Sequence, residues 1–254
     1  MIPLKNDKEI QIMAEGGQKL GQILKTTLSF VKPGITTAEL DKIAEEEIIK
    51  KGGKPSFKMV RGYHWASCIT VNSEVVHGIP GKKKIMAGDN VGIDLGIYYK
   101  GFHTDTSWTI LVPGGEAKKD KEKKKFLKAG KEALALAIQK ARPGNYLGQI
   151  SETIQTQIEG AGYHVVRELT GHGVGKSLHE DPCIPGFING DIKKTIKIKK
   201  GMTLAIEIIY TFGKPDIVLE ADGWTIATKD GKISALFEGT VAVGPNGPLI
   251  LTKL

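Results

Sequence analysis

The chain has 254 residues, of which 40% are hydrophobic and 25% charged, as in an ordinary globular domain with a sizeable core. It has no apolar run long enough to span a membrane, no signal-peptide core in its first residues, MIPLKNDKEI, and only two cysteines, so we expect a cytoplasmic protein without a disulfide framework. The net charge of +8 comes mostly from lysine clusters, which read either as solvated faces or as contacts to a polyanion.

The first elements along the chain are two predicted helices that recur 110 residues later. VKPGITTAELDKIAEEEIIKKGG matches ARPGNYLGQISETIQTQIEGAGY, and in each copy a Pro-Gly break separates a long amphipathic helix from a second helix. Thr36 and Glu39 are expected to form a capping box. Strands follow each pair. The pattern predicts an α+β fold, one domain of two pseudo-symmetric halves, about 1–113 and 114–254.

Four carboxylates lie in apolar, strand-like stretches: Asp94 in VGIDLGI, Asp105 beside TSWTILV, Glu207 in MTLAIEIIY and Glu238 in SALFEGTVAV. A buried charge must be paired or must coordinate a metal. With His172, these residues could bind two divalent cations and balance their charge, which is the ligand set of a two-metal hydrolase. The alternative for a single aspartate is a strand-end cap.

A predicted hairpin joins the first two of these carboxylates. Tyr99-Lys100 lies midway between Asp94 and Asp105, and a two-residue loop there would place the two aspartates directly opposite, with Cβ atoms roughly 5 Å apart. A bulge at Gly101 is the alternative.

In the second half, three glycines surround His172 in GHGVG and permit a close backbone approach. The short turns ADGW and KDGK predict an antiparallel sheet after residue 200. His77, before GIPG, and His179, in KSLHEDP, could hold the carbonyl and leaving nitrogen of a peptide bond. The remaining histidines are interpreted as structural: His64, His103 and His164.

Five segments in order, VNSEVVHGIP, VGIDLGI with GFHTDTSWT, LTGHGVGKSLHEDP, LAIEIIY and LFEGTVAV, resemble type I methionine aminopeptidases over nearly the whole chain. The resemblance implies the pita-bread fold, whose internal duplication agrees with the repeat. It implies two divalent ions, drawn from Co, Mn, Fe or Zn. The metal ligands that it implies are Asp94, Asp105, His172, Glu207 and Glu238. The implied substrate contacts are His77 and His179, and the implied methionine pocket is formed by Tyr63, Cys68 and Trp224. Glu207 would also accept the proton of the attacking water.

The resemblance is to the bacterial type. Only 34 residues separate His172 from Glu207, which leaves no room for the helical insertion of type II enzymes, and the chain starts at the first catalytic-domain helix. Three residues depart from the family pattern without removing a ligand. Ile208 replaces a proline, Gly239 a histidine and Leu178 an aromatic residue.

The implied function is removal of the initiator methionine from nascent proteins with a small second residue, by a monomer. The basic charge could hold the enzyme near ribosomal RNA electrostatically, and no motif predicts sequence-specific nucleic-acid binding. Two alternatives stay open. One is a related X-Pro dipeptidase-like hydrolase, and the other is a non-catalytic pita-bread binding protein.

Overall fold

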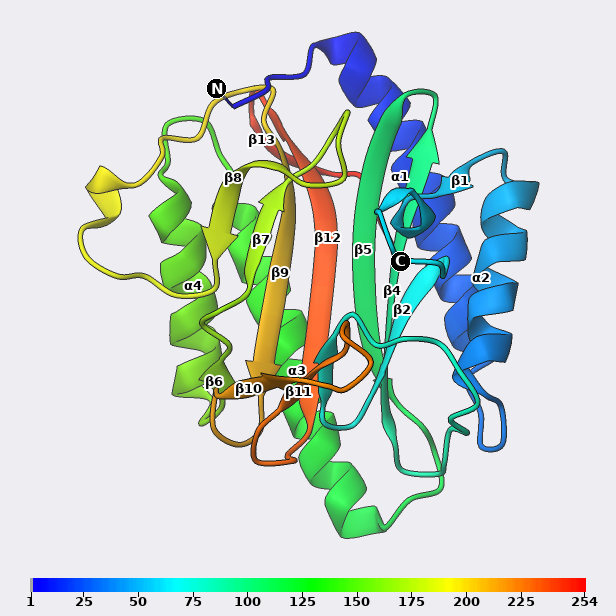
Figure 1. The fold of residues 1–254 in the computed structure, drawn as a ribbon. Helices are drawn as coiled ribbons and strands as arrows, with labels where there is room; N and C mark the ends of the chain where they lie inside the picture. Colours follow the sequence, from blue (N-terminus) through cyan, green and yellow to red (C-terminus); the bar gives the residue numbers. More distant parts are fainter. Residues whose placement is uncertain (1) are drawn as a thin grey trace.

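A computed structural model describes residues 2–254 as one large sheet with helices packed behind one face (Figure 1). The helices are α1 (Asp7–Ser29), α2 (Thr37–Lys50), α3 (Ala117–Gln139) and α4 (Leu147–Gly160), with the 3-10 turns η1 (Phe57–Met59) and η2 (Ile192–Lys194). Among the described residues, none of these helices is long and apolar enough to cross a membrane.

The two helix pairs repeat with the spacing seen in the sequence. Helices α1 and α3 begin 110 residues apart, at Asp7 and Ala117, and α2 and α4 begin 110 residues apart, at Thr37 and Leu147. The expected capping box of α2 is present, because the Glu39 amide donates to Thr36 Oγ1 and Glu39 Oε2 accepts from the Thr36 amide. The predicted helices are therefore confirmed, while the division into pseudo-symmetric halves stays a prediction.

The large sheet has ten strands, and its paired strands are all antiparallel. Its main path runs β1–β4–β5–β12–β9–β7–β8, with β2 beside β4, β6 beside β9 and β13 beside β12. The strands are β1 (Lys54–Pro55), β2 (Ser67–Val71), β4 (Asn90–Tyr99), β5 (Phe102–Leu111), β6 (His164–Val165), β7 (Thr170–Gly173), β8 (Glu180–Pro185), β9 (Thr203–Thr211), β12 (Ser234–Gly244) and β13 (Gly247–Ile250). The antiparallel arrangement expected after residue 200 is confirmed.

A second, three-stranded sheet crosses in front of the lower part of the large one (Figure 1). It consists of β10 (Ile217–Leu219), β11 (Ile226–Thr228) and β3 (Glu74–Val76). Strand β3 leads directly to His77, so this small sheet brings a candidate histidine toward the open face of the large sheet.

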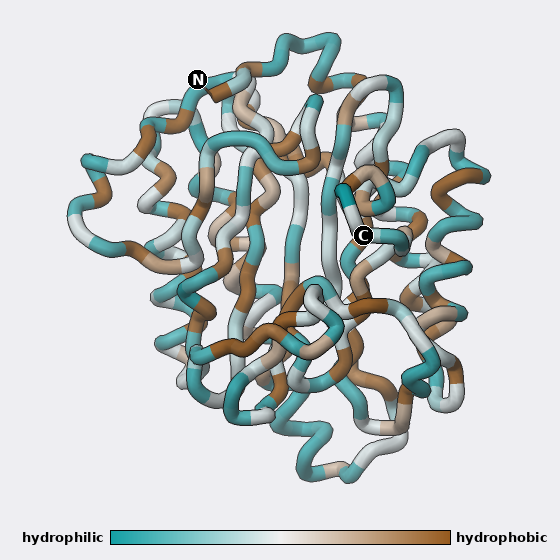
Figure 2. Tube along the Cα trace, in the orientation of Figure 1, coloured by the Kyte–Doolittle hydropathy of each residue, from teal (hydrophilic) through white to brown (hydrophobic). Residues whose placement is uncertain are grey.

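The central strands follow a two-residue alternation that separates the core from the open face. In β4, Ile93 and Leu95 belong to the core under α1 and α2, whereas Asp94 between them faces the other way. In β9, Ile206 and Ile208 belong to the core under α3 and α4. The helices are amphipathic, and their traces alternate between hydrophobic and hydrophilic residues (Figure 2). The carboxylates therefore occupy the positions that the core leaves free.

Threonine hydroxyls hold β5 and β12 together at the middle of the sheet. Only two residue pairs are in register there, Glu238 with Ser107 and Gly239 with Thr106. Thr240 Oγ1 accepts from the Asp105 amide (2.9 Å) and donates to the Asp105 carbonyl (2.7 Å), and Thr106 Oγ1 donates to the Glu238 carbonyl (2.8 Å). This seam joins the strands of the first helix pair to those of the second.

The predicted register of the β4–β5 hairpin is wrong by one residue in the turn. The turn residues are Lys100 and Gly101, both with positive φ (47° and 93°), as a two-residue hairpin turn of type I′ requires. Asp94 is therefore opposite Ser107, and Asp105 is opposite Gly96. Because Asp105 is two residues from Ser107, the two aspartates still share one face as diagonal neighbours.

Candidate metal centre

Four adjacent strands place polar side chains in one row across the open face. Asp94 on β4 is opposite Ser107 on β5, Ser107 is opposite Glu238 on β12, and Glu238 is opposite Glu207 on β9. Residues directly opposite one another in antiparallel strands share a face of the sheet. The row therefore gathers three carboxylates from positions far apart in the sequence.

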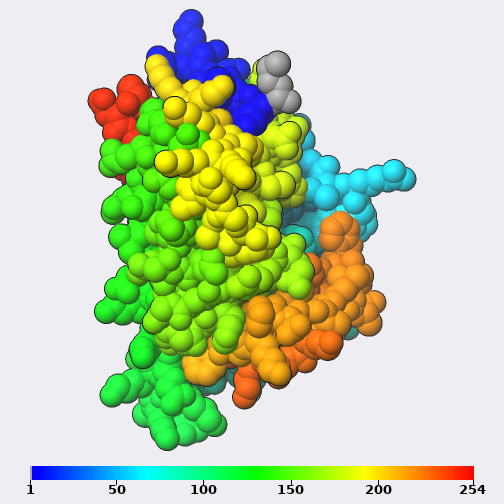
Figure 3. Space-filling view, turned by 90° about the vertical axis from the view of Figure 1, so that its left-hand side faces the viewer, coloured from blue at the N-terminus to red at the C-terminus, as the bar shows by residue number. Residues whose placement is uncertain are grey.

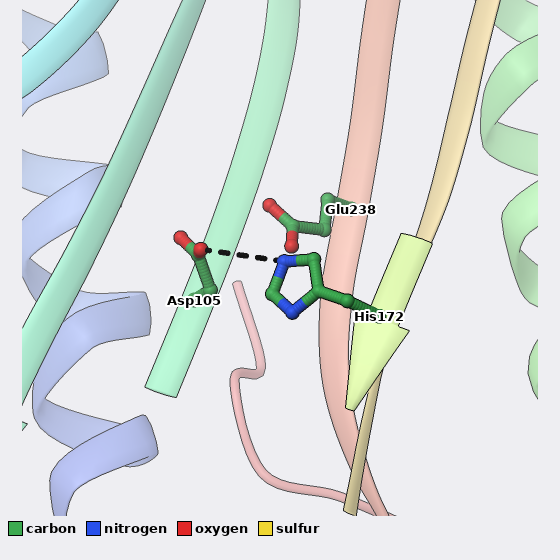
Figure 4. Close-up of side chains that lie close together, drawn as sticks. All are labelled: Asp105, His172 and Glu238. Carbon is green, nitrogen blue, oxygen red and sulfur yellow. Dashed lines mark ion pairs between the residues drawn. The ribbon is translucent and has the colours of Figure 1, made fainter. Parts of the chain in front are cut away.

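The next row adds the two remaining candidates. Asp105 lies two residues from Ser107 on β5, and His172 on β7 is opposite Ala205, which lies two residues from Glu207 on β9. His172 Nε2 is 3.5 Å from Glu207 Oε1 and 4.0 Å from Asp105 Oδ2. Ligand atoms of Asp105, His172 and Glu238 all lie within 4.8 Å of one another, and the three side chains converge from β5, β7 and β12 (Figure 4).

Burial makes the charge on these carboxylates costly. It raises the pKa of Asp105 to about 7. It also raises the pKa of Asp94, Glu207 and Glu238 well above the usual range, and the neighbouring carboxylates raise these pKa values further. Asp94 Oδ1 and Glu238 Oε1 are buried with no hydrogen-bond partner among the described residues. These oxygens are oriented for a ligand that a protein donor does not supply.

The tautomer of His172 also points to a cation. Its Nδ1 is 2.8 Å from the Gly173 carbonyl, which can only accept, so Nδ1 carries the proton. Burial lowers the pKa of His172 to about 4, so the ring is neutral near pH 7 and the lone pair of Nε2 faces Glu207 and Asp105. The lone pair of Nε2 and the carboxylate oxygens repel one another, and a divalent cation between them would be coordinated by both. The hydrogen bond from Nδ1 to a backbone carbonyl is the support that ligating histidines commonly have. The donor set therefore fits divalent metal ions.

His77 and His179 lie beside this cluster, at the border of the cavity. His77 has a positive φ of 56°, an unusual conformation for a residue other than glycine, and its side chain is exposed. His179 is also exposed, and its ring meets the His172 ring edge to face with centroids 4.4 Å apart. Desolvation of the part of each ring that lines the cavity lowers the pKa of both histidines, which favours neutral imidazoles.

An apolar cavity opens directly onto the carboxylates. It has a volume of about 140 Å³, comparable with engineered cavities of about 150 Å³ that hold benzene. The three residues proposed for a substrate pocket, Tyr63, Cys68 and Trp224, all line it, together with the candidate metal ligands and both histidines. From the side, cyan and orange segments project past the rest of the surface and leave a recess between them (Figure 3).

Aromatic contacts fix the shape of this cavity. The rings of Tyr63 and Trp224 meet edge to face with centroids 5.1 Å apart, and the Tyr63 hydroxyl donates to the Ser67 carbonyl (2.8 Å). Burial raises the pKa of the Cys68 thiol well above its usual value, so this residue acts as a small apolar wall. The cavity is also lined by residues that were not predicted from the sequence: Phe57, Val60, Val76 and Leu236. Leu236 lies two residues before Glu238 on the same strand face, so strand alternation could have identified it.

Of the three residues that depart from the family pattern, two face the core and one lines the cavity. Ile208 packs in the core under α3 and α4, and a Cβ on Gly239 would approach Ile138 of α3 and Thr252. Both positions therefore face away from the carboxylates. Leu178 lines the cavity and packs with Phe57 and Tyr63, so it is the departure that alters the pocket.

The histidines interpreted as structural lie outside the cavity lining. His103 is buried, and its Nδ1 is 2.9 Å from Ser56 Oγ. His64 and His164 are exposed, on a loop and on β6 respectively.

Comparison with known proteins places this geometry in context. Residues 11–245 match the model of metallopeptidase family M24. The chain is 44% identical to the methionine aminopeptidase of Clostridium perfringens over 254 residues, which cover the whole of both chains. It is similar to the crystal structure of methionine aminopeptidase from Thermotoga maritima, with a TM-score of 0.94, 38% identity and complete coverage of both chains.

A more distant structural likeness is to the prolidase of Pyrococcus horikoshii. The TM-score is 0.77 at 24% identity, and the match covers 98% of this chain but only 63% of the prolidase. At that identity the likeness shows a common fold alone.

Proposed function

The chain belongs to metallopeptidase family M24, with full-length relatives among the bacterial methionine aminopeptidases, and on that premise we propose how its residues carry out the reaction. The enzyme has the pita-bread fold of these relatives and removes N-terminal methionine from polypeptides in a metal-dependent hydrolysis. The observation that carries the residue assignment is the apolar cavity that ends on five metal-ligand side chains.

We propose that the strand order divides these ligands between two divalent ions. Asp94, on β4, would bind one ion alone, and Glu207 and His172, on β9 and β7, would bind the other. Asp105 and Glu238, on the two strands between them, would help to hold both ions. The set of oxygen atoms with one imidazole suits Mn²⁺, Fe²⁺, Co²⁺ or Zn²⁺.

Such ions, when bound, lower the pKa of a water ligand and polarise the scissile carbonyl. Glu207 is the proposed proton carrier. Its carboxylate would accept the proton of the attacking water and return it to the leaving amine, since it lies in the row of carboxylates at the end of the cavity. His179 is assigned to the substrate carbonyl oxygen and His77 to the scissile amide. Neutral rings at the cavity border suit both contacts.

We propose that the cavity selects methionine. Its walls combine aromatic rings with Cys68 and Leu178, an adaptable apolar lining for an unbranched thioether. The free α-amine would reach a metal ion, which restricts cleavage to chain ends. We propose that the second residue must be small, because it lies where His77 and His179 border the cavity.

Peptide cleavage with and without chelator tests this proposal. Metal-loaded protein should release methionine from Met-Ala-Ser, cleave Met-Leu-Ser poorly and leave Ala-Pro peptides intact. Chelator should abolish release, and adding back Mn²⁺, Fe²⁺, Co²⁺ or Zn²⁺ singly should rank the metals. Cleavage of Ala-Pro alone would favour the X-Pro dipeptidase alternative, and failure to take up any metal would favour a non-catalytic binding protein.

Nascent chains are the proposed substrates, and we propose an electrostatic contact with the ribosome by the monomeric enzyme. Lysines are concentrated at 82–84 and 118–125, and Lys123 of α3 donates to the Gly88 carbonyl (2.6 Å) in the loop before β4. Cosedimentation with ribosomes should weaken steeply as salt rises. Activity on free tripeptides should survive the same salt range, and absence of binding at low salt would reduce the charge to a solubility feature.

A further inference from the structure

A buried ion pair connects the start of the chain to the site. Lys5, just before α1, contacts Glu180 at the start of β8, 175 residues away, through its Nζ and Glu180 Oε2. The exposed fractions of the two side chains are only 4% and 7%. The Lys5 amide also donates to the Gly201 carbonyl (2.7 Å), so both the backbone and the side chain of Lys5 are held.

Glu180 closes the turn that carries His179. Its second oxygen, Oε1, accepts from the Ser177 amide (3.2 Å), and the Gly175 amide donates to the Ser177 carbonyl (3.0 Å). A Cβ on Gly175 would overlap Lys5 Cε and would lie 2.9 Å from Glu180 Oε1, so only glycine leaves room for the pair. The carboxylate and the lysine therefore fill the inside of the 174–180 turn.

This turn connects the two histidines. It starts two residues after His172 and contains His179, and Gly173 and Glu180 are cross-strand partners on β7 and β8. Since the His172 and His179 rings are in contact, with centroids 4.4 Å apart, a shift of the turn would move His179 relative to the metal ligands.

A buried ion pair is a poor source of net stability, because desolvating two charges offsets their attraction. A pair of apolar residues could fill the same space at similar or greater stability. What the pair adds is a fixed geometry. The carboxylate must lie where both Lys5 Nζ and the Ser177 amide reach it.

Taking the proposed role of His179 as given, we propose that Lys5 is a positioning residue that holds His179 at the substrate carbonyl by fixing Glu180. It touches neither substrate nor metal. Its loss should lower kcat, while KM for Met-Ala-Ser and metal affinity stay unchanged. Residues that orient a ligand or catalytic group typically contribute about 10- to 100-fold to activity.

The test uses Lys5→Met, Glu180→Gln and the double variant. Each single variant leaves one buried charge without its partner, so both should lower Tm as well as kcat. The double variant removes both charges but keeps an amide oxygen for the Ser177 amide. Its Tm should recover toward wild type while kcat stays about tenfold low. Recovery of kcat together with Tm would show a merely structural pair and overturn the proposal.

Lys100→Met is the matched control. Lys100 forms an ion pair with Glu15 of α1 (2.9 Å), but both side chains are exposed, so its loss should change neither kcat nor Tm. Imidazole NMR signals of His179 give a second readout that does not depend on activity. Shifted His179 signals in the double variant are expected, and unshifted signals would contradict the proposal. If wild-type protein proved inactive, the proposed function would fail while this readout still tested the positioning.

Discussion

Glu207 and Glu238 are direct cross-strand partners, so β9 and β12 hold two carboxylates opposite each other on the same face of the sheet. Like charges in this arrangement destabilise a sheet. Burial raises the pKa of both carboxyls well above the usual range, and the charge of Asp105 raises both further. We expect bound cations to offset this cost and so to tie the stability of the folded protein to metal.

Metal removal should produce a distinctive pH dependence of stability. Burial raises the folded-state pKa of Asp105 to about 7 from an ordinary value of 3.8, so the metal-free folded protein keeps protons that the unfolded chain releases. Rising pH then favours unfolding, by at most about 1.4 kcal/mol per pH unit for each such carboxylate. Histidines with lowered pKa act in the opposite direction, but only below their unfolded value of 6.5.

The Tm of chelator-treated protein should therefore fall as pH rises from 6.5, the ordinary pKa of histidine, through about 7, the folded-state pKa of Asp105. Saturating Mn²⁺ should remove the decline, and metal at 100 times its Kd should stabilise the fold by about 2.7 kcal/mol. Thermal unfolding measured across pH with and without metal checks this. Superimposable curves would contradict a metal site at the carboxylates.

Glu207→Gln should keep the fold and lose most turnover. The size is unchanged, but the proton acceptor and one ligand charge are gone, and loss of general acid–base catalysis alone is worth about 10²–10⁴-fold. The metal-free variant should be at least as stable as wild type, because the repulsion with Glu238 is removed. Near wild-type kcat at saturating metal would refute the role given to Glu207.

His172→Ala and His179→Ala should affect different quantities. His172 Nε2 faces two carboxylates, so its loss should weaken metal binding first. His179 lies in the neighbouring position at the cavity border, so its loss should lower kcat with little change in metal affinity. Calorimetric metal titration of both variants measures the difference, and equal affinities would contradict the assignment.

Tyr210→Phe should reduce stability without reducing activity. The buried Tyr210 hydroxyl donates to the Phe126 carbonyl of α3 (2.7 Å), a hydrogen bond worth about 1 kcal/mol. Burial raises the pKa of Tyr210 well above its ordinary value of 10.0, so its contribution is complete below pH 10.0 and is lost as pH rises further. In denaturant unfolding, the free energy of unfolding of the variant should therefore fall less steeply above pH 10.0 than that of wild type. An equally steep alkaline loss would be inconsistent with a buried, protonated Tyr210.

Local patterns predicted the helices and the buried strands that carry the candidate metal ligands. The Pro-Gly breaks and the Thr36–Glu39 box mark helix ends by chemistry that acts within four residues. Apolar residues flanking Asp94 and Glu207 identified buried strands because alternation is also local. The prediction of the hairpin register failed because the register depends on which two residues adopt positive φ in the turn. The sequence alone did not show that Lys100 would adopt that conformation beside Gly101.

Long-range features had no such signal. Nothing in the sequence indicates that β12 inserts between β5 and β9, although this order creates the row of carboxylates. The pairing of Lys5 with Glu180 could not be predicted from the sequence either, since a lysine before a helix cap normally lies in solvent. The cavity walls at Phe57 and Val60 come from a 3-10 turn and its C-cap, which strand and helix patterns do not describe.

The threonine seam has a consequence for when the site can form during synthesis. The hydroxyl bonds across β5 and β12 join residues 132 and 135 positions apart. Such non-local pairing closes late and slowly. A chain still attached to the ribosome with β12 inside the exit tunnel holds Asp94 and Asp105 but lacks their partner strand. We therefore expect the metal centre to assemble only once β12 has paired with β5, so that metal binds the finished fold and does not nucleate it.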